Sequence, residues 1–136
     1  MTEVKTIKLI IAGSRTIDLS INQMRDIFDI FFPVLNLNET FEIVSGGASG
    51  VDKTAKEFVK DCNNNDFYWI SKYTEFLADW ETHGKAAGPI RNKKMAEYAD
   101  RLLLIWDGES RGSKSMKNEM TKLNKPIYEL IIRKPV

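Results

Sequence analysis

The chain has 136 residues, of which 43% are hydrophobic and 29% are charged, and its formal net charge is +1. This length predicts one domain, 1–136, with a core of its own, and the near-zero charge argues against nucleic acid or an anionic membrane surface as a partner. The single cysteine, Cys62, excludes an internal disulfide, and no apolar run approaches the ~18 residues of a membrane span, so we expect a cytoplasmic protein.

The chain begins with a strand and a helix. Residues 6–12 form an almost continuous apolar run, which is typical of a parallel strand that is buried on both faces. Asp18 and Ser20 are candidate N-caps for the next segment, 21–33, in which apolar residues recur at helical spacing. Strand and helix signals alternate in the same way along the rest of the chain.

This alternation predicts an α/β fold: a Rossmann-like three-layer sandwich with a mainly parallel five-stranded sheet, in the strand order 3-2-1-4-5. Residues 71–88 carry the weakest signal, and we expect a short helix near Trp80 followed by a loop at 83–89. The other expected strands are 41–45, 67–70, 101–106 and 127–132, and the other expected helices are 51–62, 89–99 and 114–123.

A glycine-rich turn joins the second strand to the second helix. The six residues from Ser45 to Gly50 contain three glycines and two serines. Their spacing matches neither G-x-x-x-x-G-K-[ST] nor G-x-G-x-x-G. Two interpretations remain open: a cradle that holds phosphate through backbone N–H groups at a helix N-terminus, and a tight turn without a ligand.

Two other strand ends carry loops of the same character, Gly13-Ser14-Arg15 and residues 107–113. In the order 3-2-1-4-5 these loops lie beside the glycine-rich turn, where ligands of open α/β sheets bind. Arg15 and Arg111 add guanidinium groups that suit phosphate. The expected ligand-binding residues are Gly13, Ser14, Arg15, Ser45, Gly46, Gly47, Ser49, Gly50, Asp52, Arg91, Asn92, Asp107, Gly108, Ser110, Arg111, Gly112 and Ser113.

Three side chains near these loops each allow two interpretations. Arg91 is either a ligand contact or a solvated arginine. Asp52 either bonds a ribose hydroxyl or favourably occupies the first turn of its helix. Trp80 either stacks on a base or belongs to the core. His83 is the only histidine, so a zinc site is not expected, and we expect neither a metal nor a cofactor.

The sequence resembles the SLOG superfamily, in particular its small stand-alone branch related to YspA and YpsA, many members of which are encoded by phages and bacteria. The resemblance spans roughly residues 8–126. It implies a Rossmann-like fold that binds a nucleotide or nucleotide-derived ligand, and a homodimer. The superfamily also contains the cytokinin-activating phosphoribohydrolases and DprA. The motifs are IAGSR (11–15), IVSGGASGVD (43–52), DW (79–80), HGKAAGPIRN (83–92) and WDGESRGS (106–113).

The resemblance to the phosphoribohydrolases breaks at one position. The glutamate that ends their P-G-G-x-G-T-x-x-E motif aligns with Met116. Cleavage of an N-glycosidic bond needs a carboxylate near the anomeric carbon. Arg91 would hold the substrate phosphate, while Asp52, Asp107 or Glu119 would have to supply that carboxylate, at a place the enzyme motif does not use.

Two functions follow as hypotheses. The first is a protein that binds a nucleotide or nucleotide-derived ligand as a sensor or sequestering module. The alternative is a nucleotide N-glycosidase that releases free base from a nucleoside monophosphate. A DNA-binding role, by analogy with DprA, conflicts with the near-neutral charge.

Overall fold

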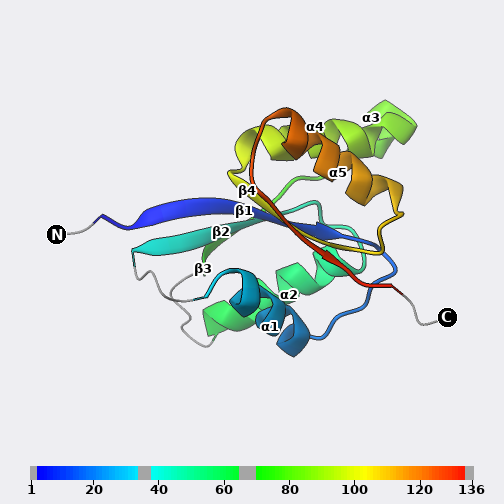
Figure 1. The fold of residues 1–136 in the computed structure, drawn as a ribbon. Helices are drawn as coiled ribbons and strands as arrows, with labels where there is room; N and C mark the ends of the chain where they lie inside the picture. Colours follow the sequence, from blue (N-terminus) through cyan, green and yellow to red (C-terminus); the bar gives the residue numbers. More distant parts are fainter. Residues whose placement is uncertain (1–2, 34–37, 65–69, 134–136) are drawn as a thin grey trace.

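The computed structural model describes residues 3–33, 38–64 and 70–133. Five parallel strands form one sheet in the order β3-β2-β1-β4-β5, with helices between successive strands (Figure 1). The predicted fold class and strand order are therefore confirmed. The elements are β1 Lys5–Gly13, α1 Ile21–Phe31, β2 Glu39–Ser45, α2 Val51–Asn64, β3 Ile70–Glu75, α3 Trp80–His83, the 3-10 turn η1 Gly84–Ala86, α4 Ala87–Tyr98, β4 Arg101–Trp106, α5 Arg111–Lys122 and β5 Ile127–Ile131.

Helices cover both faces of the sheet. In Figure 1, α1 and α2 lie below the strands, while α3, α4 and α5 lie above them. The side chains of β1 divide between two cores: Leu9 and Ile11 pack with α1 and α2, whereas Ile10 packs with α4 and α5. The apolar run at 6–12 is continuous because both faces of this central strand are buried.

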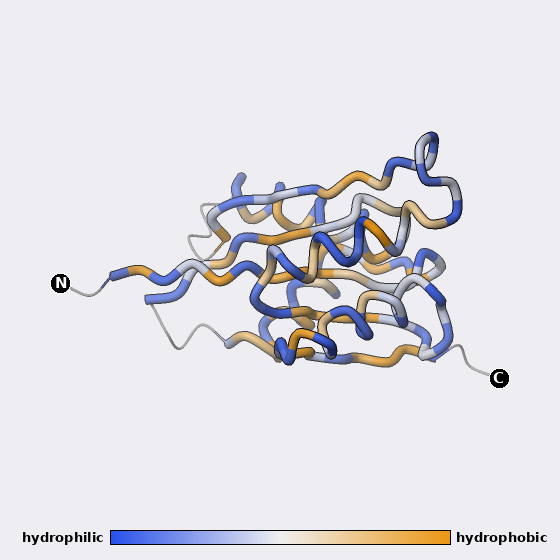
Figure 2. Tube along the Cα trace, turned by 90° about the horizontal axis from the view of Figure 1, so that it is seen from above, coloured by the Kyte–Doolittle hydropathy of each residue, from blue (hydrophilic) through white to orange (hydrophobic). Residues whose placement is uncertain are grey.

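The lower core is rich in phenylalanine. The Phe28 ring of α1 lies 5.2 Å from the Phe41 ring, edge-on, and 5.5 Å from the Phe58 ring of α2. Cys62 is buried in the same core, and burial raises the pKa of its thiol to about 11, so the thiol stays protonated and unreactive. Figure 2 shows hydrophobic residues along the strands and hydrophilic residues at the turns.

Two local contacts fix the ends of helices. Ser20 caps α1 and forms a reciprocal capping box with Gln23, as one of the two predicted caps. Lys125 closes the carboxyl end of α4, where its Nζ lies 2.7 Å from the carbonyl oxygens of both Ala96 and Ala99. The first contact satisfies backbone groups at the start of α1, and the second ties the end of α4 to the turn before β5.

The third strand was predicted at 67–70, but β3 runs over Ile70–Glu75; residues 67–69 lie outside the described residues. β3 is an edge strand whose Ser71 and Lys72 are exposed, so it lacks the apolar signal of a central strand. The loop predicted at 83–89 is also wrong. The chain is already helical from Gly84, and α4 begins at Ala87 rather than at Pro89.

The most consequential correction concerns α5, which was predicted to begin at Lys114 and begins at Arg111. Asp107 causes the earlier start, because its Oδ1 accepts the N–H groups of Glu109 and Ser110, each at 2.8 Å, and so turns the chain into the helix. Arg111, Gly112 and Ser113 are thus the first turn of α5 and not a loop.

Two absences hold for the described ranges. No helix there is long and apolar enough to cross a bilayer. The His, Cys, Asp and Glu side chains within the same ranges form no group of three or more that is arranged to hold a metal ion.

Candidate functional site

A pocket of about 300 Å³ lies at the carboxyl ends of β1 and β4 and beside the turn that follows β2. These strands are neighbours in the sheet, so the loops that follow them meet at one edge. The residues that line the pocket are Ala12, Gly13, Ser14, Arg15, Thr16, Gly46, Ala48, Asp52, Arg91, Asn92, Met95, Asp107, Ser110, Arg111, Gly112, Ser113 and Met116.

Ser14 is buried under the pocket and connects the loops around it through hydrogen bonds. It is 1% exposed, its Oγ lies 2.9 Å from the Ser110 Oγ, and the same oxygen accepts the Asp107 N–H at 3.1 Å. Its carbonyl oxygen accepts the N–H of Val51, the first residue of α2, at 3.4 Å. One residue therefore fixes the loops after β1 and β4 and the start of α2 relative to one another.

The turn after β2 depends on its glycines. Gly47 and Gly50 have positive φ angles of 68° and 72°. A Cβ built on Gly50 would lie 2.4 Å from the Ser14 carbonyl oxygen and 2.5 Å from that of Arg15. Glycine is required at position 50 for both reasons, because an L side chain is strained at this φ and the neighbouring backbone leaves no room.

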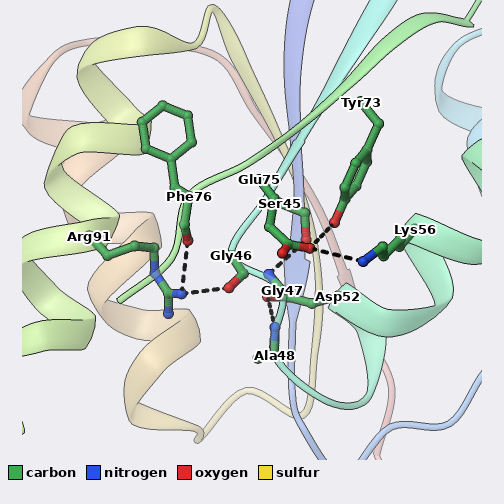
Figure 3. Close-up of polar contacts among 10 residues, drawn as sticks. All are labelled: Ser45, Gly46, Gly47, Ala48, Asp52, Lys56, Tyr73, Glu75, Phe76 and Arg91. Atoms are coloured by element: carbon green, nitrogen blue, oxygen red, sulfur yellow. Dashed lines mark hydrogen bonds and ion pairs between the residues drawn. The ribbon is translucent and has the colours of Figure 1, made fainter. Parts of the chain in front are cut away.

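The amides of this turn already have acceptors within the protein. The Ala48 N–H donates to Asp52 Oδ2 at 3.1 Å, and the Gly47 N–H donates to Ser45 Oγ at 3.2 Å, as Figure 3 shows. The carboxylate of Asp52 thus occupies the position where we expected a ligand phosphate to accept from the glycine-rich turn.

Arg91 reaches the turn from α4 (Figure 3). Its Nη1 donates to the carbonyl oxygens of Gly46, at 2.8 Å, and Phe76, at 3.5 Å. A Cβ built on Gly46 would lie 2.6 Å from that Nη1 and 3.1 Å from Asp52 Oδ2. Because Gly46 has no side chain, the guanidinium and the carboxylate can approach the turn from two sides.

Burial changes the ionisation of both groups. It raises the pKa of Asp52, an effect opposed by the Ala48 N–H and by the positive charges of Arg91 and Arg15. Burial lowers the pKa of Arg91, an effect opposed by Asp52 and reinforced by Arg15. The pocket floor therefore carries a partly desolvated pair of opposite charges beside a further guanidinium.

The amide of Asn92 connects α4 to the far wall of the pocket. It is 6% exposed, and its Nδ2 lies 3.3 Å from both the Gly112 carbonyl oxygen and the Ser115 Oγ. The Asn92 Oδ1 accepts from Arg91 Nε at 3.0 Å. The start of α5 and the guanidinium of Arg91 are thus held in one hydrogen-bonded unit.

The first turn of α5 is open, unlike the glycine-rich turn. Ser110 is the N-cap residue, but its side chain bonds to Ser14 and does not cap the helix. Ser113, in the same turn, is 4% exposed, and its Oγ has no hydrogen-bond partner among the described residues. The guanidinium groups of Arg15 and Arg111 likewise make no hydrogen bond or ion pair within the described part of the chain.

Asp107 lines the pocket next to the start of α5 and stabilises the turn that leads into this helix. Its two hydrogen bonds from the Glu109 and Ser110 amides lower the pKa of its carboxyl below the usual range. The side chain therefore stays ionised and holds the loop that leads into α5.

Comparison with known proteins relates the chain to a phage protein. No family model and no solved structure matches the chain. The "Gene 61 protein" of Mycobacterium phage D29 is 34% identical over 86 residues, which cover 62% of this chain and 67% of the phage protein. The chain belongs to the family of that phage protein. The name of this Gene 61 family states no activity, so the site must be interpreted from its geometry.

In this Gene 61 family member, most of the expected ligand-binding residues do lie in one place. Gly47 and Ser49 line an adjoining pocket rather than the first, and Gly108 lines a third, which shares Thr16 and Asp107 with the first. Neither Ser45 nor Gly50 lines the first pocket; both support its turn from within. The expected residues that line it are Gly13, Ser14, Arg15, Gly46, Asp52, Arg91, Asn92, Asp107, Ser110, Arg111, Gly112 and Ser113.

The residues considered for the enzyme hypothesis separate in space, and Asp107 is among those that line the pocket. Arg91 and Asp52 line the pocket, whereas Glu119 does not, and its Oε1 accepts from Lys122 Nζ at 3.1 Å instead. Met116, which replaces the motif glutamate of the similar enzymes, does line the pocket. Trp80, the aromatic candidate, is 50% exposed and so does not belong to the core.

Sequence reasoning missed the side chains behind the glycine-rich turn. Glu75 packs against Gly47 where a side chain would be, and a Cβ there would lie 2.7 Å from its Cδ. Its Oε1 accepts from Tyr73 Oη at 2.6 Å and lies 3.7 Å from Lys56 Nζ (Figure 3). Burial and the bond to Glu75 raise the pKa of Tyr73. No motif signals this cluster, because it depends on Tyr73 and Glu75 belonging to β3, which the sequence places earlier in the chain.

Proposed function

We propose that this protein binds a nucleotide or nucleotide-derived ligand in the pocket, as a sensor or sequestering module, with a ligand phosphate at the first turn of α5. The observation that carries the proposal is the open start of α5, a helix of 12 residues without a side-chain cap. It faces a pocket that also holds two guanidinium groups without a partner among the residues that the structure describes. A helix N-terminus of this kind favours an anion through its free N–H groups and its dipole.

The unpartnered hydroxyl of Ser113 supports the same position. Buried polar groups in proteins normally have a hydrogen-bond partner, so one without a partner calls for an explanation. An anion bound beside Ser113 would supply the acceptor. Arg15 and Arg111 are exposed and free to make charge-assisted contacts with the same group.

The glycine-rich turn has a different role in the proposal. Its Gly47 and Ala48 amides are satisfied by Ser45 and Asp52, so it offers little to a phosphate. The Asp52 carboxylate would instead repel an anion and accept hydrogen bonds from hydroxyl groups. A phosphate at α5 and a hydroxyl-bearing sugar toward Asp52 use both charges of the pocket, which supports a nucleotide rather than a bare anion.

Binding of ribonucleoside 5′-monophosphates tests this proposal. A ligand at 100 times its Kd adds about 2.7 kcal/mol to the free energy of unfolding, which raises the Tm of a domain of this size by roughly 10 °C. We expect Arg111→Ala to weaken binding about tenfold, since it removes one exposed charge-assisted contact of ~1.4 kcal/mol. The control is Lys60→Ala, which removes one positive charge from the exposed surface of α2.

Equal weakening by Arg111→Ala and Lys60→Ala would mean that only net charge matters and would remove the support for this site. Failure of every nucleotide to raise the Tm of the folded wild-type protein would count against the proposed function itself.

Asp52 favours one second candidate, the nucleotide N-glycosidase. It is a carboxylate that is 6% exposed, lines the pocket and has a raised pKa, as expected of a group that stabilises or activates a reacting centre. Release of free base from a nucleoside monophosphate, abolished in Asp52→Asn with the Tm preserved, would establish this activity. Retention of base release in that variant would exclude Asp52 as the catalytic carboxylate.

The proposed setting is the cytoplasm and the proposed assembly is a homodimer. The buried, free thiol of Cys62 is compatible with a reducing compartment. Light scattering on the purified protein tests the assembly, and a monomer at all concentrations would rule out the dimer.

A further inference from the structure

A second pocket of about 420 Å³ adjoins the first beyond the glycine-rich turn. Arg15, Gly46, Ala48 and Arg91 line both pockets, so the two lie side by side around the turn, and together they are called the groove below. The far end of the groove has a different chemistry, because Leu77 and Trp80 line it and no carboxylate does so among the described residues.

The segment that carries these apolar side chains is anchored. The Phe76 N–H donates to the Ser45 carbonyl oxygen at 2.9 Å, and the Phe76 carbonyl oxygen accepts from Arg91 Nη1 at 3.5 Å, as Figure 3 shows for the second contact. The Phe76 ring packs on Tyr98 with 5.3 Å between centroids. Both the backbone and the side chain of Phe76 are therefore held in place, immediately before Leu77.

Trp80 is also held in place, although half of it faces solvent. It opens α3, whose N-cap Asp79 accepts the Thr82 N–H at 3.1 Å. A Cβ built on Gly88 would lie 3.3 Å from the Trp80 Cη2, so the indole lies directly over the start of α4. Trp80 is 50% exposed and Leu77 is 76% exposed. Large apolar side chains held in an exposed position beside a polar pocket are typical of a binding surface.

We propose that this end of the groove binds the base of the nucleotide, with the base against the indole of Trp80 and the phosphate at α5. This inference rests on the proposed function, because it needs the phosphate position to orient the ligand. Every base has a flat π surface that stacks on an aromatic side chain, and the adjacent guanidinium groups of Arg15 and Arg91 suit such a surface too. The groove then matches a nucleotide in order: anion, sugar near Asp52, and base.

Binding of three kinds of probe to the full chain tests the inference: inorganic phosphate, ribose 5-phosphate, and the four ribonucleoside 5′-monophosphates. We expect the best nucleotide to bind the wild-type protein about tenfold more tightly than ribose 5-phosphate, the range that stacking of one base provides. Trp80→Ala should remove that advantage and leave the affinities for phosphate and ribose 5-phosphate unchanged, whereas Trp80→Phe should keep most of it.

Ile30→Ala is the control, since it removes another large, exposed apolar side chain, one that lies on α1 on the opposite face of the sheet. An unchanged nucleotide advantage in Trp80→Ala would overturn the inference and leave the proposed function standing. Equal affinity of the wild-type protein for ribose 5-phosphate and all four nucleotides would also overturn it. If none of the probes binds, both the inference and the proposed function fail. A change in self-association, with nucleotide affinity intact, would assign Trp80 to a protein contact instead.

Discussion

The starts of α2 and α5 are built from similar residues but differ in what they offer a ligand. Each helix follows a strand through a short turn that contains glycine and serine. At α2 the protein supplies its own acceptors: the Asp52 carboxylate, the Ser45 hydroxyl and the Ser14 carbonyl oxygen. At α5 the one hydroxyl in the capping position, that of Ser110, is turned toward Ser14.

The difference teaches that glycine content does not measure how open a turn is. The glycines at α2 are needed for close packing, since Gly50 meets backbone and Gly46 meets Arg91. At α5, a Cβ on Gly112 would meet nothing within 4 Å. The turn with more glycine is therefore the more closed of the two, and the anion site is best sought at the other.

Gly50→Ala should have the largest effect of the substitutions that test this comparison. The new Cβ would clash with the backbone of Ser14 and Arg15, and the φ of 72° disfavours any L side chain. We expect the free energy of unfolding to fall by about 3 kcal/mol or more, measured by urea denaturation. A loss below 1 kcal/mol would mean that the turn adapts and that its packing does not depend on glycine.

Asp52→Ala should open the closed turn to anions. The substitution removes a negative charge from the pocket and frees the Ala48 N–H, so we expect sulfate to bind more tightly, on the order of fivefold. Calorimetric titration at neutral pH measures this affinity. Equal or weaker sulfate binding by the variant would show that Asp52 does not exclude anions.

The acidity of Asp52 provides a second measurement on the same pair of proteins. Its pKa is raised above 3.8, so it takes up a proton before an ordinary aspartate as the pH falls. Sulfate, which keeps its charge over this range, should bind the wild-type protein more tightly as the pH falls from 7 toward 4. The affinity of Asp52→Ala should vary less, because Asp107, the other carboxylate in the pocket lining, has a lowered pKa and stays ionised.

Gly112→Ala should have the smallest effect and is the matched partner of Gly50→Ala. The Cβ enters open space in the first turn of α5, and alanine has the higher helix propensity by up to ~1 kcal/mol. We expect the free energy of unfolding to stay constant or rise by about 0.5 kcal/mol. A loss comparable to that of Gly50→Ala would remove the contrast between the two turns.

The fold could be predicted because its sequence signals extend over whole strands and helices. The apolar runs of β1 and β4 and the strand–helix alternation fix a parallel sheet without knowledge of any single contact. β3 was displaced by several residues because an edge strand buries less and carries polar residues such as Lys72. A pattern of average hydrophobicity does not locate such a strand.

The sequence predicts which residues line the pocket better than it predicts what each side chain does there. Topology brings Arg15, Gly46 and Arg111 to one pocket, and strand order alone predicts that. The direction of individual hydrogen bonds is a different matter. Whether Ser110 caps its helix or bonds to Ser14, and whether Asp52 faces a ligand or the turn, depends on side-chain rotamers that are set by packing.

The position of β1 in the middle of the sheet constrains how the chain folds. β1 pairs on one side with β2, close in sequence, and on the other with β4, which ends at Trp106; Ile11 of β1, for example, pairs with Leu103 of β4. While the chain leaves the ribosome, one edge of β1 stays without its partner until most of the protein has been made. Completion of the sheet is thus a late, long-range event, which makes folding slower than in helical proteins of this size. Until then β1 exposes unpaired backbone groups and apolar side chains that a chaperone can protect.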